Sequence, residues 1–176
     1  DHRRVVVVGG GAAGFFAAIS AAELNPSAEV VLFEAGNKVL RKVKVSGGGR
    51  CNLTHGCFDP VELAKNYPRG SRELKGAFHH WQPRDTIEWF EQAGVRTKIE
   101  ADGRAFPVSD CSQTIIDCLW GEAHKLGVQV DFERGLSGLE QTADGKWLID
   151  SGDEKKETFH KVCIAAGSLK SAGLDS

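Results

Sequence analysis

The sequence predicts an α/β fold built around a parallel β-sheet, and three observations carry this prediction. Four consecutive valines, Val5–Val8, are apolar and β-branched, as expected of a parallel strand that is buried on both faces. Residues 12–24 have the alanine-rich composition and apolar spacing of a helix, and a second apolar strand, 29–34, follows it. Strand, helix and strand within about 30 residues form a crossover unit, so the two strands are expected to be parallel neighbours.

Length and composition are those of an ordinary globular domain. The chain has 176 residues, of which 41% are hydrophobic and 26% charged, so it is long enough to bury a core as one domain. The formal net charge of -2 gives no overall attraction to nucleic acid or to a membrane surface. No apolar run approaches the roughly 20 residues that span a bilayer, so we expect no membrane association and a cytoplasmic location.

The cysteines and histidines lack the pattern of a metal site or a disulfide framework. The 5 cysteines are an odd number, are widely spaced and include no Cys-x-x-Cys pair. His79 and His80 are adjacent, so their side chains would point in different directions on a helix. We therefore expect no bound metal.

The middle of the chain alternates between helices and strands. Asn25-Pro26 stops the first helix, and residues 35–56 are expected to form a long, basic, glycine-rich loop. Apolar stripes and glycine stop signals define the remaining elements. We expect a short helix that begins at Asp59 or Pro60 and three further helices over 72–81, 83–93 and 111–126. We also expect strands over 95–99 and 128–132.

Residues 136–159 change character and resemble an antiparallel β-meander. Turn residues at 144–145 and 151–153 separate three short strand-like segments, 136–141, 146–150 and 154–159. A last buried strand, 160–165, follows the meander and ends in Ala165-Ala166-Gly167.

A glycine turn, Gly9-Gly10-Gly11-Ala12-Ala13-Gly14, connects the first strand to the first helix. In the spacing Gly-x-Gly-x-x-Gly, Gly9 allows the tight turn, Gly11 lets a pyrophosphate approach the backbone, and Gly14 lets the helix pack closely on the strand. The free N–H groups and the positive dipole end of the helix favour that anion. The turn predicts a Rossmann-like site for an ADP-containing dinucleotide; a glycine-rich turn in a nucleotide-free α/β protein is the alternative.

Glu34 ends the second strand, 20 residues after Gly14. At that place an acidic side chain accepts hydrogen bonds from ribose hydroxyls, and its charge repels a 2′-phosphate. We therefore expect Glu34 to bind the adenosine ribose, and NADP to be disfavoured at this site.

The glycine turn by itself serves both FAD and NAD. The meander and the Ala-Ala-Gly ending of the last strand favour FAD, because simple NAD-binding Rossmann domains lack this arrangement, which is similar to that of the glutathione-reductase-like superfamily. The predicted fold is a Rossmann-like FAD-binding domain with a parallel sheet and an inserted three-stranded antiparallel β-meander. An NAD-binding module without flavin chemistry stays open as the alternative.

Residues 46–52, Ser-Gly-Gly-Gly-Arg-Cys-Asn, form the most unusual segment. Three glycines beside a serine can curl their N–H groups around an anion or a ring edge, and the Arg50 guanidinium suits a phosphate or a flat ring. A solvated surface loop explains the composition equally well. Cys51 is the one candidate for a reactive residue, since Arg50 would lower the pKa of its thiol, but a packed thiol without redox function is the favoured interpretation.

Two segments resemble the signature of one family of bacterial NAD(P)/FAD-dependent oxidoreductases, the BaiN/RdsA (YhiN-like) family. The first is 41–54, and the second is 103–109, which resembles the family's Gly-Arg-x-Phe-Pro segment. The order of elements matches over nearly the whole chain. This sequence departs from the family pattern at Leu40, where glycine is usual, at His55, where asparagine is usual, and at 165–168, where Ala-Thr-Gly-Gly is common.

The resemblance implies a cofactor site whose residues all contact FAD. The pyrophosphate would be lined by Gly9, Gly11, Ala12, Ala13 and Gly14, and the adenosine ribose would be held by Glu34 and Ala35, with Arg41 and Lys42 along the same edge. The flavin end would be wrapped by Ser46, Gly47, Gly48, Gly49, Arg50, Cys51 and Asn52. The adenine would be contacted by the backbone of Leu136, and FAD would be approached at the end of the final strand by Ala166 and Gly167.

The activity that the resemblance implies is an FAD-dependent oxidoreductase passing hydride between the flavin and an organic substrate. NAD(P)H or oxygen would be the second redox partner. Family members act on amines, steroid-like compounds or uridine in ribosomal RNA; a small molecule is the favoured substrate, and ribosomal RNA stays an alternative. The catalytic residues are unknown, and Arg104 and Phe106 would either face substrate or form a structural turn.

Family members are much longer than this chain. Residues 1–176 are therefore expected to be the FAD/dinucleotide-binding domain, without the family's substrate-side domain and C-terminal FAD segment. A truncated, non-catalytic nucleotide-binding fragment is a further alternative.

Overall fold

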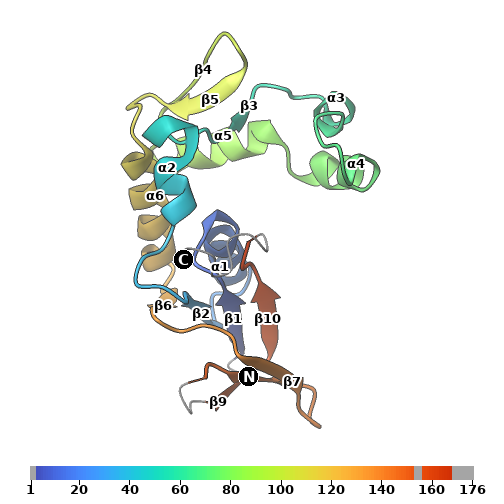
Figure 1. Ribbon diagram of the computed structural model, residues 1–176, viewed down its shortest axis with the longest axis vertical. Coiled ribbons are helices and arrows are strands. Elements are labelled where there is room, and N and C mark those ends of the chain that lie inside the picture. The colour runs from blue at the N-terminus through green and yellow to red at the C-terminus, as the bar shows by residue number, and fades with distance from the viewer. Residues whose placement is uncertain (1–2, 153–155, 168–176) are drawn as a thin grey trace, which may run out of the picture. The chain divides into compact units, whose positions relative to one another are not determined.

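The computed structural model describes residues 3–152 and 156–167, and the chain divides into two compact units (Figure 1). Unit 1 comprises Asp1–Lys42 and Leu119–Ser176, and unit 2 comprises Val43–Cys118. Each unit has its own β-structure and is described by itself.

Unit 1 is built on a four-stranded parallel sheet with the strand order β10-β1-β2-β6. Val6 of the central strand lies beside Val31 on one side and beside Val162 on the other. The predicted parallel sheet is thereby confirmed. Its strands are β1 (Arg4–Val8), β2 (Glu29–Phe33), β6 (Gln129–Asp131) and β10 (Lys161–Ile164).

Helix α1 (Ala12–Leu24) covers one face of this sheet and has the predicted bounds. Because side chains alternate along a strand, Val7 faces α1 while Val6 and Val8 face the opposite side. The buried face of α1 includes Phe15 and Ile19, which are at most 1% exposed. The N–H of Asn25 donates to the carbonyl of Ala21 at the end of the helix, as the stop signal predicts.

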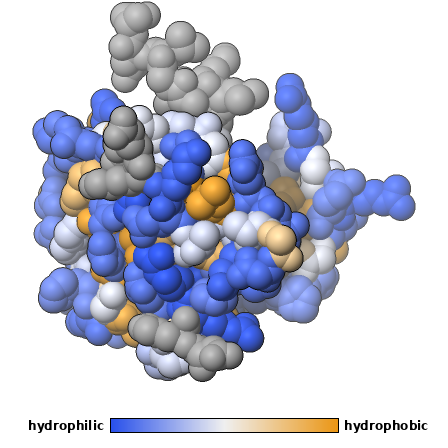
Figure 2. Space-filling model, turned by 90° about the horizontal axis from the view of Figure 1, so that it is seen from below, coloured by the Kyte–Doolittle hydropathy of each residue, from blue (hydrophilic) through white to orange (hydrophobic). Residues whose placement is uncertain are grey.

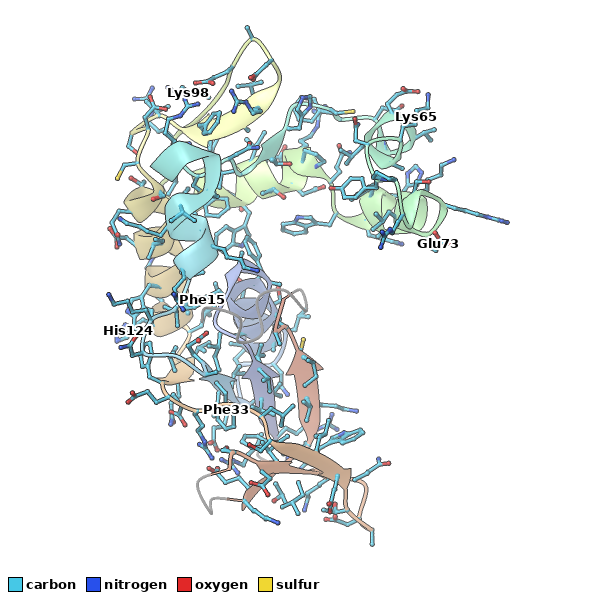
Figure 3. The ribbon with its side chains drawn as sticks, viewed as in Figure 1. Phe15, Phe33, Lys65, Glu73, Lys98 and His124 are labelled. Carbon is cyan, nitrogen blue, oxygen red and sulfur yellow. The ribbon has the colours of Figure 1, made fainter. Side chains whose placement is uncertain are left out.

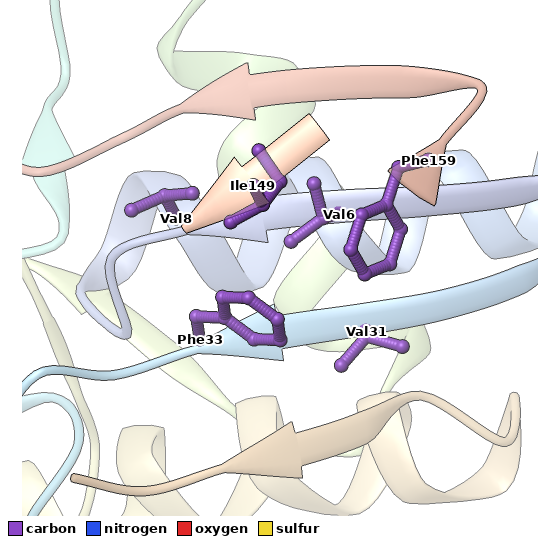
Figure 4. Close-up of a cluster of buried hydrophobic side chains, with 6 residues drawn as sticks. All are labelled: Val6, Val8, Val31, Phe33, Ile149 and Phe159. Carbon is purple, nitrogen blue, oxygen red and sulfur yellow. The ribbon is translucent and has the colours of Figure 1, made fainter. Parts of the chain in front are cut away.

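A three-stranded antiparallel sheet contributes to the core on the other face. Its strands are β7 (Gly138–Gln141), β8 (Trp147–Asp150) and β9 (Lys156–Phe159), paired in that order, so the predicted meander is confirmed. One buried cluster joins the two sheets, and Phe33 and Phe159 meet edge to face in it, with ring centroids 5.9 Å apart (Figure 4). The cluster comprises Val6, Val8, Val31, Phe33, Ile149 and Phe159.

Two arginines, Arg4 and Arg134, connect the meander to the parallel sheet through Glu157. Arg4 donates to Glu157 at 2.8 Å, and Arg134 donates to the other carboxylate oxygen of Glu157. The Arg4 guanidinium lies 4.4 Å from the ring centroid of Phe159, and that of Arg134 lies 4.0 Å from the ring centroid of Phe33. Hydrogen bonds from Arg4 and then Arg134 lower the pKa of Glu157, so the carboxylate is charged where it joins the two sheets.

Unit 2 contains a three-stranded antiparallel sheet, with the order β3-β5-β4, and several helices. The strands are β3 (Thr54–His55), β4 (Thr97–Ile99) and β5 (Arg104–Pro107). The helices are α2 (Arg41–Gly49), α3 (Pro60–Ala64), α4 (Ser71–His80), α5 (Pro83–Gln92) and α6 (Ser112–Lys125), of which α2 and α6 cross the boundaries between the units.

Two helices of unit 2, α3 and α5, begin at side chains that accept hydrogen bonds from the backbone of the first turn. An oxygen of Asp59 accepts the N–H groups of Val61 and Glu62 at 2.8 and 2.9 Å, which stabilises the first turn of α3. The carboxylate of Asp85 accepts the N–H of Gln82 at the start of α5. These helices therefore begin where the sequence predicts.

The predicted loop 35–56 is wrong in part, because it contains α2 and the short strand β3. Only the first residues of α2 are regular, since Ser46 is extended and Gly47 and Gly48 have positive φ. Arg41 and Lys42 are unfavourable at a helix start, so local signals argue against this helix. The strand β5 was also not predicted; it ends at Pro107, which lacks an N–H for continued pairing.

Within residues 3–152 and 156–167, no helix is both long enough and apolar enough to cross a bilayer. The face of the molecule in Figure 2 is mostly hydrophilic, with hydrophobic residues in small, separate spots.

Candidate functional site

Two glycines of the turn are required by backbone packing. Gly9 has a φ of +113°, and a Cβ there would lie 2.4 Å from the carbonyl oxygen of Ala165. A Cβ at Gly14 would lie 1.7 Å from the carbonyl oxygen of Gly9. Gly9 thus allows the last strand to approach the turn, and Gly14 allows α1 to approach the first strand.

Gly11 is different, because it is exposed and no packing demands a glycine there. It is the N-cap of α1, with φ -87° and ψ -172°, a conformation open to any residue. A Cβ would meet no atom of the described chain within 4 Å. The first turn of α1 carries neither a side-chain cap nor an acidic residue among the described residues, and Ala12 and Ala13 are exposed. The free N–H groups of this helix end therefore fit a pyrophosphate.

Glu34 binds the glycine turn itself. One carboxylate oxygen accepts the N–H of Gly10 at 3.0 Å, and the other accepts the N–H of Gly36 at 2.7 Å. Gly10 is buried, and a Cβ there would lie 2.7 Å from a Glu34 oxygen. Each oxygen keeps acceptor capacity for a hydroxyl group. Sequence patterns suggest the ribose role but not this second role, because nothing in the spacing indicates that the side chain turns back to Gly10.

Leu40 ties the segment after Gly36 to the same turn. Its N–H donates to the carbonyl of Gly10 at 2.8 Å, its φ is 56°, and its side chain is 1% exposed. A left-handed backbone favours glycine, so leucine is an unusual residue at this position. The contact brings the exposed residues Arg41 and Lys42, at the start of α2, into the neighbourhood of the turn.

The other predicted contacts of unit 1 lie close by. A Cβ at Gly135 would lie 3.6 Å from the Cβ of Ala35, so the residue that precedes Leu136 lies beside Ala35. Leu136 packs against the buried cluster and precedes β7 instead of belonging to it. Unit 1 thus contains Gly9, Gly11, Ala12, Ala13, Gly14, Glu34, Ala35, Arg41, Lys42, Leu136, Ala166 and Gly167.

The other predicted segment, 46–52, lies in unit 2 and forms a left-handed turn. Gly47, Gly48, Gly49 and Cys51 have φ values of 56°, 69°, 85° and 63°. The N–H of Cys51 donates to the carbonyl of Ser46 at 3.0 Å and closes the turn. A Cβ at Gly48, which is exposed, or at Gly49, which is half-buried, would meet no described atom within 4 Å, so a ligand can approach the backbone closely there.

Arg50 supports this turn from the side. Its guanidinium lies 3.8 Å from the ring centroid of Phe106, and it donates to Glu100 at 2.6 Å and to Asp110 at 3.3 Å. Phe106 is fully buried, and a Cβ at Gly47 would come within 2.9 Å of its ring. The two segments that resemble the family signature therefore meet in unit 2, where Phe106 has a structural role.

Cys51 does not have the environment that a reactive thiol requires. The side chain is 5% exposed, and burial raises the pKa of the thiol, an effect that a hydrogen bond with Ser46 only partly offsets. The expectation that Arg50 lowers this pKa is wrong, because Arg50 pairs with Glu100 and Asp110. Cys51 is a packed thiol.

The curated relatives are oxidoreductases and RNA-modifying enzymes. The chain is 28% identical over 173 residues to a 3-dehydro-bile acid delta(4,6)-reductase of Clostridium scindens, covering 98% of this chain and 41% of that protein. It is 28% identical over 161 residues to a ribosomal RNA dihydrouridine synthase of Escherichia coli, covering 92% of this chain and 38% of that protein. The chain thus spans only about two fifths of the length of these relatives.

Solved structures share the fold at low sequence identity. A 3-ketosteroid-delta4-(5alpha)-dehydrogenase of Rhodococcus jostii matches with a TM-score of 0.65 and 16% identity, covering 94% of this chain and 46% of that one. The FrdA subunit of Escherichia coli quinol fumarate reductase matches with a TM-score of 0.65 and 15% identity, covering 96% of this chain and 33% of that one. The fold is therefore one that oxidoreductases use.

The resemblance to the BaiN/RdsA (YhiN-like) family, inferred from segments 41–54 and 103–109, is confirmed. The bile acid reductase and the ribosomal RNA dihydrouridine synthase are both members of that family. The model of the HI0933-like protein Rossmann domain matches residues 3–176. The chain belongs to the HI0933-like family.

Proposed function

We propose that this chain is the dinucleotide-binding part of an FAD-dependent oxidoreductase and that unit 1 binds the ADP half of FAD. The observation that carries the proposal is the open N-terminus of α1 at Gly11, where a Cβ would meet no described atom while Gly9 and Gly14 are enclosed by backbone. A glycine with room around it, between two glycines without room, fits a position reserved for a ligand.

The residues of unit 1 then have distinct tasks. The N–H groups of Ala12 and Ala13 bind the pyrophosphate, and the helix dipole adds to their attraction for the anion. Glu34 accepts a hydroxyl of the adenosine ribose while it keeps Gly10 in place. Ala35 and Leu136 contact the adenosine, Arg41 and Lys42 add positive charge near the phosphates, and Ala166 and Gly167 approach the cofactor at the end of β10.

The turn at 46–52 is assigned to the flavin end of the cofactor. Its left-handed backbone leaves room for a ligand beside Gly48 and Gly49, and the pair formed by Arg50 and Phe106 supports this conformation. When bound, the flavin supplies hydride transfer. The protein binds and orients it, and we assign no catalytic residue within this chain.

An organic small molecule is the substrate that we favour, with NAD(P)H or oxygen as the second redox partner and a cytoplasmic location. The name of the Clostridium scindens relative, a bile acid reductase, supports this substrate class. Uridine in RNA is a second candidate, supported by the name of the Escherichia coli relative. We further propose that residues 1–176 act together with a substrate-side domain and a C-terminal FAD segment in a longer protein.

Absorption spectroscopy of the purified protein tests whether it binds FAD. We expect the absorption bands of oxidised flavin, and FAD in the supernatant after denaturation. Calorimetry with FAD and with NAD separates the two cofactors. Tight binding of NAD and no binding of FAD would favour the NAD-binding module, and binding of neither by a folded chain would favour the non-catalytic fragment.

A further inference from the structure

The segment 65–84 of unit 2 is strongly basic in a chain that is slightly acidic. It holds five lysines and arginines and a single carboxylate, Glu73, so its formal charge is +4, whereas the whole chain carries -2. The five cations are exposed, and one of them, Lys65, forms a surface pair with Glu62 at 2.6 Å. They are Lys65, Arg69, Arg72, Lys75 and Arg84.

Two of these cations lie on the side of α4 that faces away from its apolar residues, and a third lies just before the helix. Arg72 and Lys75 are separated by one helical turn, so they lie on one stripe, and Arg69 precedes the helix start. In the described part of the chain, no carboxylate forms an ion pair with Arg69, Arg72 or Lys75. No residue of α4 is buried, and Arg72 and Lys75 are exposed on it, while Leu74 and Phe78 are half-buried (Figure 3, where Lys65 and Glu73 are labelled).

Two exposed aromatic rings flank the cations. Tyr67 is 42% exposed and rests against Phe78, with ring centroids 5.3 Å apart. Trp81 follows α4, is 48% exposed, and donates through its indole N–H to the hydroxyl of Thr86 at 2.9 Å. Both side chains are therefore fixed by contacts within unit 2 and partly open to solvent.

We propose that this surface, termed the α4 surface and made of Tyr67, Arg69, Arg72, Lys75 and Trp81, binds single-stranded RNA. Guanidinium and ammonium groups bind phosphates, and exposed rings stack on bases that are free of a duplex. A duplex offers no free base faces, and a membrane-bound helix would present bulky apolar residues on its exposed side, where α4 presents cations. The inference deepens the second substrate candidate.

The test measures the anisotropy of a fluorescein-labelled single-stranded RNA of about twelve nucleotides, a length within the range that such proteins cover. With three phosphate contacts, the logarithm of the affinity falls with the logarithm of salt with a slope of about -2. We expect the triple variant Arg69→Ala, Arg72→Ala, Lys75→Ala to bind at least about tenfold more weakly and with a slope near zero.

A matched control removes the same charge elsewhere. Arg3, Lys125 and Lys161 are exposed residues of unit 1, so their triple alanine variant has the same net charge and is expected to bind as the unchanged chain does. Trp81→Leu is expected to weaken binding about tenfold and to leave the salt slope unchanged. Circular dichroism establishes that each variant is folded.

Equal losses in the two triple variants, or duplex RNA that binds as tightly as the single strand, would overturn the proposal. The assay needs neither flavin nor turnover. A failure to bind RNA is therefore distinguishable from a failure to bind FAD.

Discussion

At the scale of single residues, the glycines of one turn are needed for different physical reasons. Gly14 is enclosed by the carbonyl of Gly9, whereas Gly11 faces open space. The sequence motif includes both glycines, but only the fold separates the one needed for packing from the one that leaves room for a ligand.

Gly11→Ser is expected to separate binding from stability. Serine is a good N-cap, so the free energy of unfolding of the apoprotein should stay within a few tenths of a kcal/mol, roughly, of its original value. The hydroxyl would occupy the N–H groups proposed for the pyrophosphate, so FAD affinity should fall about tenfold. Calorimetry and thermal melting measure the two effects.

Gly14→Ala is the matched control for that experiment, since its Cβ would lie 1.7 Å from the carbonyl oxygen of Gly9. It should lower the free energy of unfolding by about 3 kcal/mol or more. If Gly11→Ser keeps full FAD affinity, the pyrophosphate does not lie at this helix end.

At position 40, glycine is expected to give a more stable protein than alanine, the reverse of the usual order. Truncation of this buried side chain costs about 2–5 kcal/mol. Its φ of 56° is unfavourable for alanine by about 1 kcal/mol and not for glycine. Leu40→Gly should therefore be about 1 kcal/mol more stable than Leu40→Ala in urea unfolding. The usual order, with alanine more stable, would show that this left-handed conformation is absent.

Residue roles are partly readable from the sequence. The glycine turn and Glu34 follow a known spacing, so their nearness in space could be predicted. The state of Cys51 could not, because the effect of Arg50 depends on Glu100 and Asp110, which are far away in the sequence. Local sequence indicates a charge, and the fold decides which partner receives it.

At the scale of elements, Glu157 joins the meander to the parallel sheet through Arg4 and Arg134. Because its pKa is lower in the folded state, the stabilisation is present above its ordinary value of about 4.5 and is lost as the pH falls through the lower folded value. Glu157→Gln should lower the free energy of unfolding by about 1 kcal/mol at pH 7.

The pH dependence tests that assignment. The difference in unfolding free energy between the unchanged chain and Glu157→Gln should be constant above about pH 5 and shrink below about pH 4.5. Urea unfolding between pH 3 and pH 7 measures it. A difference that does not change with pH would mean that the charge of Glu157 does not stabilise the two sheets.

Elements with strong local signals were predictable, and those held by distant contacts were not. The valines of β1 and the turn residues of the meander act within a few positions of the chain. Helix α2 begins with two cations and passes into glycines, so its helical part depends on packing, for which Val43 is buried. Strand β5 is short and starts after Gly103, and only its pairing with β3 and β4 defines it.

At the scale of the whole molecule, the chain has two units with different chemical character. Unit 1 combines the glycine turn, Glu34 and the meander, and unit 2 carries the turn at 46–52 and the basic α4 surface. The net charge of -2 gives no sign of that surface, since charges elsewhere in the chain cancel it. Total charge therefore predicts less about partners than the distribution of charge does.

Unit 1 is proposed to bind the ADP half of FAD, and competition between nucleotides tests this binding most directly. FAD is titrated into the apoprotein by calorimetry, alone and in the presence of ADP or FMN. We expect binding of one FAD per chain, clear competition by ADP, little competition by FMN, and about tenfold weaker binding by Glu34→Ala. FMN that competes as well as ADP, or a folded chain for which Glu34→Ala leaves FAD binding unchanged, would contradict the account.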